Sequence, residues 1–481
     1  MENEEMQSSQ SINRPLLVSV ILAGAFVVIL NQTLLNTAIP KIMGDLSVSA
    51  ATAQWLTTGF QLTNGVMIPV TAFLIEKFST RKLFLTAMIL FAAGTLTAAI
   101  APTFPVLLAA RVLQASGAGI MIPLMQTIFL LIFPVEKRGA AMGMVGLVIA
   151  FAPAIGPTLS GWIVESHSWR VLFYMILPIA LLDIVFAFFA LKNVTKLTHP
   201  KIDLTSIVLS SFGFGGLLFG FSSAGNDGWE STKVTVALII GALALGLFIW
   251  RQLTLEKPML EFRVFKNKIF ALSVFIGMMV MVSMIGVELL LPLYMQNALD
   301  YTAFESGLLL LPGAIVMGIM SPITGRIFDK IGARPLAIIG LTIVAVMTFL
   351  FSQMSASSSY LYMMVVYAIR MFGISLVMMP IMTAGLNQLP NHMIPHGTAM
   401  NNTMRQVAGS IGTASLITVM TNNSKEAAHQ GLSHPMIQGM SDAFMLAAII
   451  AVVALIMSFF IKPMNASKKG PKVVKEPVAE G

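Results

Sequence analysis

The stretch Ala72-Phe-Leu-Ile-Glu-Lys-Phe-Ser-Thr-Arg-Lys82 returns 253 residues later as Gly325-Arg-Ile-Phe-Asp-Lys-Ile-Gly-Ala-Arg-Pro335. Both copies are short charged turns between two long apolar runs. In each, an acid is followed by Lys and then by a basic pair or Arg-Pro. Such a recurrence indicates a chain built by doubling a membrane bundle, and parallel repeats of this kind are typical of transporters.

The composition is that of a membrane protein. Of the 481 residues, 56% are hydrophobic and only 10% are charged, and the mean hydropathy is +0.84. A soluble domain carries about 25% charged residues. The chain has no Cys, which excludes disulfides, thiolate catalysis and Cys-ligated metals. It also has no HExxH, GxSxG or paired-carboxylate pattern, so we expect neither an enzyme nor a cofactor.

The apolar runs predict an all-α polytopic membrane protein. A bilayer core of about 30 Å needs about 20 apolar helical residues. Fourteen such runs are present, the first at 15–38 and the thirteenth at 397–420. The connections are short, the longest being 254–269 and 421–439, which leaves no room for a sizeable soluble domain.

The basic residues predict the orientation. With fourteen spans, 22 of the 29 Lys and Arg fall on the side of the termini, four on the opposite side, and Arg111, Arg370 and Arg405 within spans. Cytoplasmic loops carry the excess of Lys and Arg, so both termini should face the cytoplasm. The net charge of +8 is then a topology signal. We expect membrane lipids as partners, and no nucleic acid.

Two further echoes share nearly the same offset as the charged turns. Met121-Ile-Pro-Leu-Met125 resembles Met378-Met-Pro-Ile-Met382, and Gly139-Ala-Ala-Met142 resembles Gly397-Thr-Ala-Met400. Chance similarity among Met-, Pro- and Gly-rich segments is the alternative, but three echoes in register favour duplication. A shift of eight helices predicts a 6+2+6 plan: a cytoplasmic N-terminus (1–14), a six-helix bundle (15–191), an inserted hairpin with its linker (192–268), a second six-helix bundle (269–461) and a disordered basic tail (462–481).

Several motifs carry a family resemblance over nearly the whole chain: Leu30-Asn-Gln-Thr-Leu-Leu-Asn-Thr-Ala-Ile-Pro40, Gln54-Trp55, Arg111-Val-Leu-Gln114, Trp169-Arg170 and Leu291-Pro-Leu-Tyr-Met-Gln296. With the charged turns, they resemble the fourteen-helix drug–proton antiporter branch of the major facilitator superfamily. Within it, the chain looks most similar to the lincomycin-export type of Gram-positive bacteria. The turn after the second helix departs from the family pattern by having Ala72, Glu76 and Ser79 in place of Gly, Asp and Gly.

The resemblance implies a proton-coupled multidrug efflux antiporter in the bacterial cytoplasmic membrane. It would export amphipathic drug-like compounds, lincosamide-like antibiotics among them, by alternating access, as a monomer driven by the proton gradient. One alternative is an exporter of an endogenous metabolite or signalling molecule with incidental drug efflux. Another is an importer, which the motif of the fifth helix argues against.

The fifth predicted helix (139–164) carries a stripe of small residues nearly four apart, which predicts close packing against another helix. Two prolines on it remove backbone donors and favour a kink. The resemblance implies that this helix seals the outward side through the antiporter motif, whose residues here are Gly143, Pro153, Gly156, Pro157 and Gly161.

The two charged turns are expected to form a conformational latch on the cytoplasmic side. Their acids could pair with Arg or cap a neighbouring helix N-terminus in one state and release it in another. A static anchor is the alternative. The latch residues are Glu76, Lys77, Arg81, Asp329, Lys330 and Arg334.

Charges inside spans are costly and mark functional sites. Only two acids lie well inside spans, Glu288 and Asp183. The branch usually has a carboxylate where this chain has Asn31, which cannot carry a proton. Glu288 is therefore the expected proton carrier, and Arg111 a candidate partner. A purely structural Glu288 is the alternative, and Asp183 is the second candidate.

The substrate cavity should lie between the two bundles, lined by helices 1, 2, 4, 5, 9, 10, 12 and 13 of the family plan. The 35 Met and 31 Phe can supply adaptable apolar walls. One or two acids in such a cavity suit neutral or monocationic amphiphiles. The polar cavity candidates are Asn31, Gln32, Asn36, Gln61, Asn64, Gln114, Gln126, Tyr294, Asn401, Asn402, Arg405 and Gln406.

Overall fold

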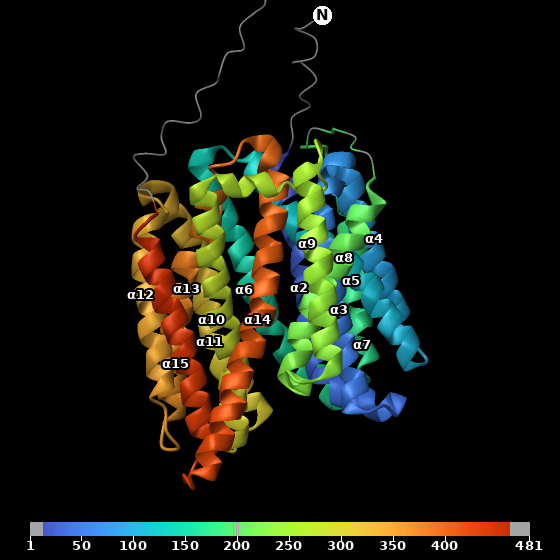
Figure 1. The fold of residues 1–481 in the computed structure, drawn as a ribbon. Coiled ribbons are helices and arrows are strands. Elements are labelled where there is room, and N and C mark those ends of the chain that lie inside the picture. The colour runs from blue at the N-terminus through green and yellow to red at the C-terminus, as the bar shows by residue number, and fades with distance from the viewer. Residues whose placement is uncertain (1–12, 196, 199, 201, 462–481) are drawn as a thin grey trace, which may run out of the picture.

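The computed structural model describes residues 13–461 apart from 196, 199 and 201 (Figure 1). These residues form fourteen long α-helices, three short 3-10 helices and no strand, so the predicted all-α polytopic architecture is confirmed. The predicted tail, and the predicted N-terminal segment up to residue 12, lie outside the described residues. The helices are α2 (Arg14–Leu46), α3 (Ala50–Lys77), α4 (Thr80–Ala99), α5 (Phe104–Ile132), α6 (Arg138–Ser166), α7 (Arg170–Ala190), α8 (Leu204–Asp227), α9 (Thr232–Thr254), α10 (Lys268–Ala298), α11 (Ala303–Ile331), α12 (Ala333–Ser352), α13 (Tyr360–Leu386), α14 (Ile394–His429) and α15 (Pro435–Ser458).

Short polar residues begin many of these helices. Ser49, Ser79 and Asp203 each accept a hydrogen bond from a backbone N–H in the first turn of α3, α4 and α8. Thr302 and Glu305 form a reciprocal capping box at the start of α11. Such caps satisfy backbone donors that the helix itself leaves unpaired. They let the chain turn within a few residues between successive spans.

Two helices run beyond their predicted spans. The first span was expected to end at 38 and the thirteenth at 420, whereas α2 continues to Leu46 and α14 to His429. Part of the predicted connection 421–439 is therefore helical. Both extensions carry charged side chains, for example Asp45 and Lys425, which belong outside the hydrocarbon layer. Hydropathy detects only the apolar stretch that fits a bilayer. A helix can continue into polar residues beyond that stretch, because its backbone hydrogen bonds do not depend on hydropathy.

The helix α14 is exceptional in composition. By length and composition, thirteen segments of the described chain are apolar enough to cross a membrane, and α14 is not among them. Its first half carries Asn401, Asn402, Arg405 and Gln406. A long polar helix at the centre of a membrane bundle must turn its polar face toward protein or a cavity, because lipid cannot hydrogen-bond it.

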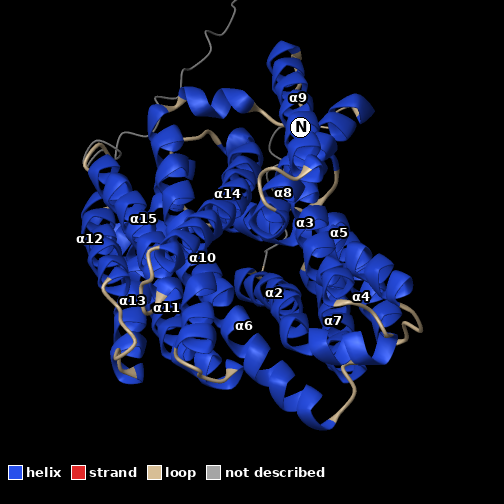
Figure 2. Cartoon of the chain, turned by 60° about the horizontal axis from the view of Figure 1, so that its bottom comes forward, coloured by secondary structure: helices blue, strands red, loops and turns tan. Residues whose placement is uncertain are grey.

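The helices pack as two groups. Helices α2–α5 and α7 pack mainly within the first group, and α10–α15 form the second, while α8 and α9 form a hairpin (Figures 1 and 2). Helix α6 contacts α2 of the first group and, most extensively, α11 of the second. The hairpin packs along the junction of the groups, because α8 contacts both α3 and α14. At this junction Trp55 stacks on Phe219, with ring centroids 5.8 Å apart, and the Trp229 indole N–H donates to the Thr418 hydroxyl at 2.7 Å. This packing agrees with the 6+2+6 plan, although its exact boundaries stay a prediction.

The described chain begins and ends at the same end of the bundle, the upper end in Figure 1. We call this the terminal end. Helix α6 of the first group packs closely along α11 of the second. Hydrogen bonds join the two groups near the terminal end. Gly139 and Ala140 donate to Asp329, and Arg138 donates to Asn387 and Asn391. The two groups are therefore joined at the terminal end.

Candidate functional site

A cavity of about 540 Å³ lies between the two groups of helices. Its walls come from α2, α3, α5 and α6 on one side and from α10, α11, α13 and α14 on the other. These correspond to the eight helices that the resemblance implied. The lining reaches Gly307, one turn from the start of α11 at the end opposite the termini. The cavity therefore extends from mid-depth toward that opposite end.

Six of the predicted polar residues line this cavity. Three of them, Asn402, Arg405 and Gln406, lie on α14. Because they are three and four residues apart, they share one face of that helix. Apolar lining comes from several methionines, such as Met281 and Met284 of α10. The six polar residues are Gln32, Asn64, Glu288, Asn402, Arg405 and Gln406.

Other predicted cavity residues lie elsewhere. Tyr294 is buried and its hydroxyl donates to the Ser355 carbonyl at 2.8 Å. Gln126 is buried behind the cavity wall and accepts a hydrogen bond from Asn402 at 2.6 Å. Asn401 lines a second, much smaller cavity, into which Arg405 also projects.

Three further candidates also lie away from the lining. Asn31 is buried with its Nδ2 unpartnered among the described residues, and Gln61 is exposed on α3. Gln114 is buried and bonds to Arg111 and Thr95. The side chain of Asn36 lies outside the described part of the structure.

Glu288 is half-buried in the cavity wall, on α10. Its electrostatic neighbours are Arg370 and Tyr367, both on α13. Arg370 is fully buried and donates to the Ser283 carbonyl at 2.7 Å and to the Thr348 hydroxyl at 3.0 Å. Its Nη1 has no hydrogen-bond partner among the described residues. The Glu288 carboxylate thus faces a buried guanidinium that retains free donors.

The other two proton-coupling candidates lie inside the first group of helices. Arg111 is fully buried, donates to the Leu56 carbonyl at 3.3 Å and to Gln114 at 3.0 Å, and stacks over Phe60 with 4.2 Å to the ring centroid. Asp183 packs against Gly24 between α2 and α4, where a Cβ on that glycine would lie 2.6 Å from its Oδ2. Neither residue lines the cavity, and the structure does not bring Arg111 to Glu288.

The acid of the second charged turn caps a helix across the junction. Asp329 accepts the backbone N–H of Gly139 at 2.7 Å and that of Ala140 at 2.9 Å, at the first turn of α6. An anion is stabilised at a helix N-terminus by free N–H groups and by the helix dipole. The glycines there let the helices touch, because a Cβ on Gly325 would collide with the backbone of Gly139.

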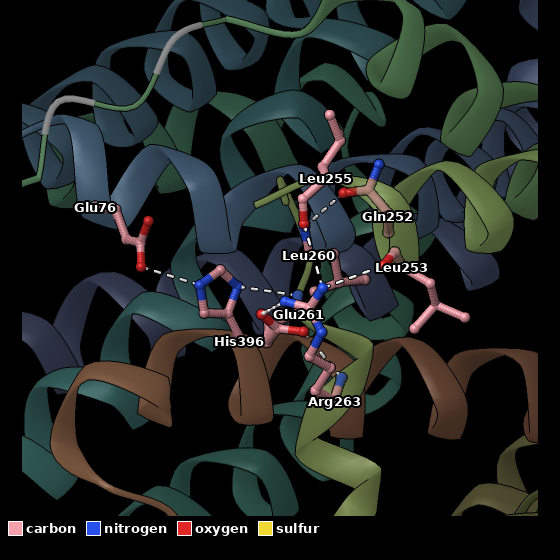
Figure 3. A network of polar contacts seen from close by, with 8 residues as sticks. All are labelled: Glu76, Gln252, Leu253, Leu255, Leu260, Glu261, Arg263 and His396. Atoms are coloured by element: carbon pink, nitrogen blue, oxygen red, sulfur yellow. Dashed lines mark hydrogen bonds and ion pairs between the residues drawn. The ribbon is translucent and has the colours of Figure 1, made fainter. Parts of the chain in front are cut away.

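The acid of the first charged turn also reaches across to the other group. Glu76 bonds to His396, the third residue of α14, at 2.9 Å from its Oε1 to Nε2 (Figure 3). The His396 Nδ1 accepts the backbone N–H of Glu261 at 3.4 Å, so the ring proton lies on Nε2 and is donated to Glu76. Glu261 in turn pairs with Arg263 at 3.3 Å. The linker before α10 is thereby tied to the terminal junction.

The basic residues of the two charged turns do not pair with the described acids across the junction. Lys77 lies over Phe73 at 5.4 Å and Arg81 over Phe188 at 4.3 Å. Lys330 and Arg334 form no ion pair within the described chain. The cross-junction cation is instead Arg138, a buried residue that donates to Asn387 at 3.0 Å and to Asn391 at 3.3 Å.

The small residues of α6 serve two interfaces. Toward the terminal end they meet α11: a Cβ on Gly143 would lie 2.6 Å from the Ser321 carbonyl oxygen. Farther along, Gly156 touches Thr33 of α2. Pro153 and Pro157 line the cavity, and Gly161 has open space around it. In this conformation the α6–α11 contact closes the terminal end, and a seal on the outward side by this helix stays a prediction.

Sequence reasoning missed three residues of these arrangements. Arg370 was recognised as a charge inside a span, but nothing in the sequence places α13 beside α10. Arg138 looked like an ordinary positive-inside charge. His396 directly precedes the repeated Gly397-Thr-Ala-Met400 motif, and that position was the available signal. Within the described residues, no group of three or more His, Asp or Glu could hold a metal ion.

Comparison with known proteins agrees with this architecture. Residues 21–413 match the family model of the Major Facilitator Superfamily. The chain is 57% identical to the uncharacterized MFS-type transporter YcnB of Bacillus subtilis (strain 168), over 95% of this chain and 98% of that one. It is 45% identical to the lincomycin resistance protein LmrB of Listeria monocytogenes, over 93% and 96%.

A solved structure shows the same fold. The proton:xylose symporter XylE bound to 6-bromo-6-deoxy-D-glucose superposes with a TM-score of 0.64 at 14% identity, covering 93% of this chain and 96% of that one. The resemblance drawn from the motifs is therefore confirmed. The chain belongs to the major facilitator superfamily and is a multi-pass bacterial membrane transporter, not an enzyme.

Proposed function

We propose that the protein is a proton-coupled exporter of amphipathic, drug-like compounds that works by alternating access. The observation that carries this proposal is the cavity between the two groups of helices, which is largely apolar and holds a single carboxylate, Glu288, among its described lining residues. Such a cavity can hold an amphipathic ligand and a proton on neighbouring surfaces. The 45% identity to a lincomycin resistance protein supports antibiotics as part of the substrate range.

We infer that the terminal end faces the cytoplasm. The support is the 22-to-4 distribution of Lys and Arg between the two sides. With that orientation the structure is an outward-facing state: the terminal end is closed by the α6–α11 contact, and the cavity extends toward the exterior. Efflux requires a second state in which this closure opens and the cavity receives substrate from the cytoplasm or inner leaflet.

Glu288 is assigned the proton-carrying role. It is the carboxylate that a ligand in the cavity could approach, and it faces Arg370, whose Nη1 is unpartnered among the described residues. A carboxylate that pairs with this guanidinium in one state and is protonated in the other would carry one proton per cycle. Arg370 replaces Arg111 as the expected counter-charge, because Arg111 is occupied within the first group of helices.

Asp329 and Glu76 are assigned the latch role. Each acid crosses the junction to the start of a helix in the other group, α6 or α14, and each contact must break for the terminal end to open. The two latches are chemically different, since Asp329 binds backbone N–H groups directly and Glu76 binds through His396.

Transport into proteoliposomes tests this function. Purified protein is reconstituted, a pH gradient is imposed, and uptake of labelled lincomycin and of several cationic and neutral dyes is followed. Uptake that depends on the gradient supports a proton-coupled exporter of broad range. Gradient-driven transport of an endogenous metabolite with no transport of these compounds would favour the alternative, a metabolite exporter. Uptake that ignores the gradient would contradict proton coupling.

A further inference from the structure

We propose that Arg405 is the binding subsite for a carboxylate, and that the cavity accepts zwitterionic amphiphiles, which carry an amine and a carboxylate on one apolar body. This inference rests on the proposed export function and names a substrate class for it. Its starting observation is a buried cation in the cavity wall for which the described protein supplies no anion.

Arg405 has almost no polar partner. It is only 9% exposed, and its Nη2 lies 3.8 Å from the Met281 sulfur, which is a weak acceptor. None of the ion pairs among the described residues includes it. Guanidinium carries five N–H donors in a planar fork, and a charge inside a membrane span is costly when it is unpaired. The remaining donors of Arg405 are open to the cavity, where water or a ligand can accept from them.

The surroundings of Arg405 suit an anion. Its near neighbours on α14 that face the cavities, Asn401, Asn402 and Gln406, are neutral amides. No described acid pairs with Arg405, so no carboxylate of the described chain competes for its donors. A carboxylate can take two parallel N–H···O bonds from one guanidinium, which gives both affinity and a defined orientation.

The opposite charge lies farther along the same wall. Met281, which touches Arg405, and Glu288 are seven residues apart on α10, and both line the cavity. Seven residues correspond to about 10.5 Å of helix rise. Arg405 and Glu288 are thus offset along the cavity and do not neutralise each other by direct contact. An elongated ligand can present its carboxylate to Arg405 and its amine toward Glu288.

This assignment changes the expectation drawn from the acids alone, which favoured neutral or monocationic compounds. That expectation took no account of Arg405 in the cavity wall, because an Arg within a span is ordinarily interpreted as the partner of an acid in the same protein. Here no ion pair among the described residues includes Arg405, so its guanidinium is open to a ligand.

A matched pair of dyes tests the proposal. Rhodamine 110 carries a free carboxylate, and rhodamine 123 is its methyl ester, so the two differ only in the group that Arg405 would bind. Export of both is measured in proteoliposomes for the wild-type protein, Arg405→Gln, Arg405→Lys and the control Lys425→Gln. Lys425 lies on the same helix, outside the cavity lining. Binding of both dyes to the purified wild-type protein is measured by fluorescence anisotropy.

The ratio of rhodamine 110 to rhodamine 123 export is the decisive quantity. We expect Arg405→Gln to lower this ratio about tenfold or more, since a charge-assisted hydrogen-bonded pair is lost. Arg405→Lys should lower it less, and Lys425→Gln should match the wild-type ratio. An unchanged ratio in Arg405→Gln would overturn the proposal.

Two results with the wild-type protein distinguish failure of the carboxylate subsite from failure of the export function. Tighter binding and faster export of the ester than of the acid would refute the carboxylate subsite while leaving the export function intact, and this result does not depend on any variant folding. Failure of wild-type protein to export either dye, or lincomycin, under a pH gradient would count against the export function itself.

Discussion

Replacing Gly325 with alanine should weaken closure of the terminal end. Gly325 lies where α11 crosses α6, and a Cβ there would meet the carbonyl oxygen and carbon of Gly139 and lie 3.3 Å from the Cα of Ala140. All three are backbone atoms, so no side-chain rotation can make room. The two helices must move apart, and the bonds from Gly139 and Ala140 to Asp329 must lengthen with them.

The size of the effect follows from the packing. Extra methyl or methylene groups in a well-packed contact cost about 1–3 kcal/mol. The cost falls only on the closed state, because the two helices separate at the terminal end when it opens. The ratio of closed to open molecules should therefore fall by about 5- to 150-fold.

The absence of Cys makes the assay direct. Thr158→Cys places one thiol in the cavity wall, in a chain that has no other. In the outward-facing state a membrane-impermeant maleimide can reach this thiol from outside the cell. We expect Gly325→Ala to slow its labelling. Gly161→Ala is the matched control on α6, because a Cβ there meets nothing within 4 Å.

Equal labelling rates in Gly325→Ala, Gly161→Ala and the parent would refute the reasoning. Such a result would mean either that the α6–α11 contact does not control access to the cavity or that the closed state tolerates a methyl group at this crossing. Thermal unfolding of each variant, measured in parallel, separates a conformational shift from loss of the fold.

Three further perturbations test other contacts. Asp329→Ala removes the acceptor of two backbone hydrogen bonds at the start of α6 and should weaken closure of the terminal end by about 1–3 kcal/mol. Asp329→Asn keeps one acceptor oxygen and should weaken closure less. Maleimide labelling in the Thr158→Cys background measures both effects. His396→Phe removes the link from Glu76 to α14 and should change the transport rate, while substrate affinity at equilibrium stays near that of wild type. Asp183→Asn should alter thermal stability and leave the dependence of transport on the pH gradient in place, because Asp183 lies outside the cavity lining; loss of that dependence would move the coupling role to Asp183.

Much of the fold could be predicted because the length of each apolar run, compared with the thickness of a bilayer, locates the spanning helices. The spans near 15–38 and 397–420 were found, and only the polar extensions to Leu46 and His429 were missed. The repeat of the charged turns predicts two related groups of helices, and the helices do pack in two groups. It could not say that one acid would cap α6 directly and the other would act through His396.

The candidate site was only partly predictable, because neighbouring residues of a helix point in different directions. Gln32 lines the cavity and Asn31 does not, although both are amides in adjacent positions. Asn402, Arg405 and Gln406 share a face by their spacing. The neighbour of Glu288 is Arg370, 82 residues away on another helix, and only the packing of α13 brings the two within electrostatic range.

The central claim, that Glu288 carries the coupled proton, is tested most directly by proton release. Purified protein in weakly buffered detergent solution is mixed with a saturating transported substrate, and a pH-sensitive dye records the protons released. The account predicts release from the wild-type protein and none from Glu288→Gln, with the variant still folded and still able to bind substrate. Equal release from Glu288→Gln and wild type would contradict it.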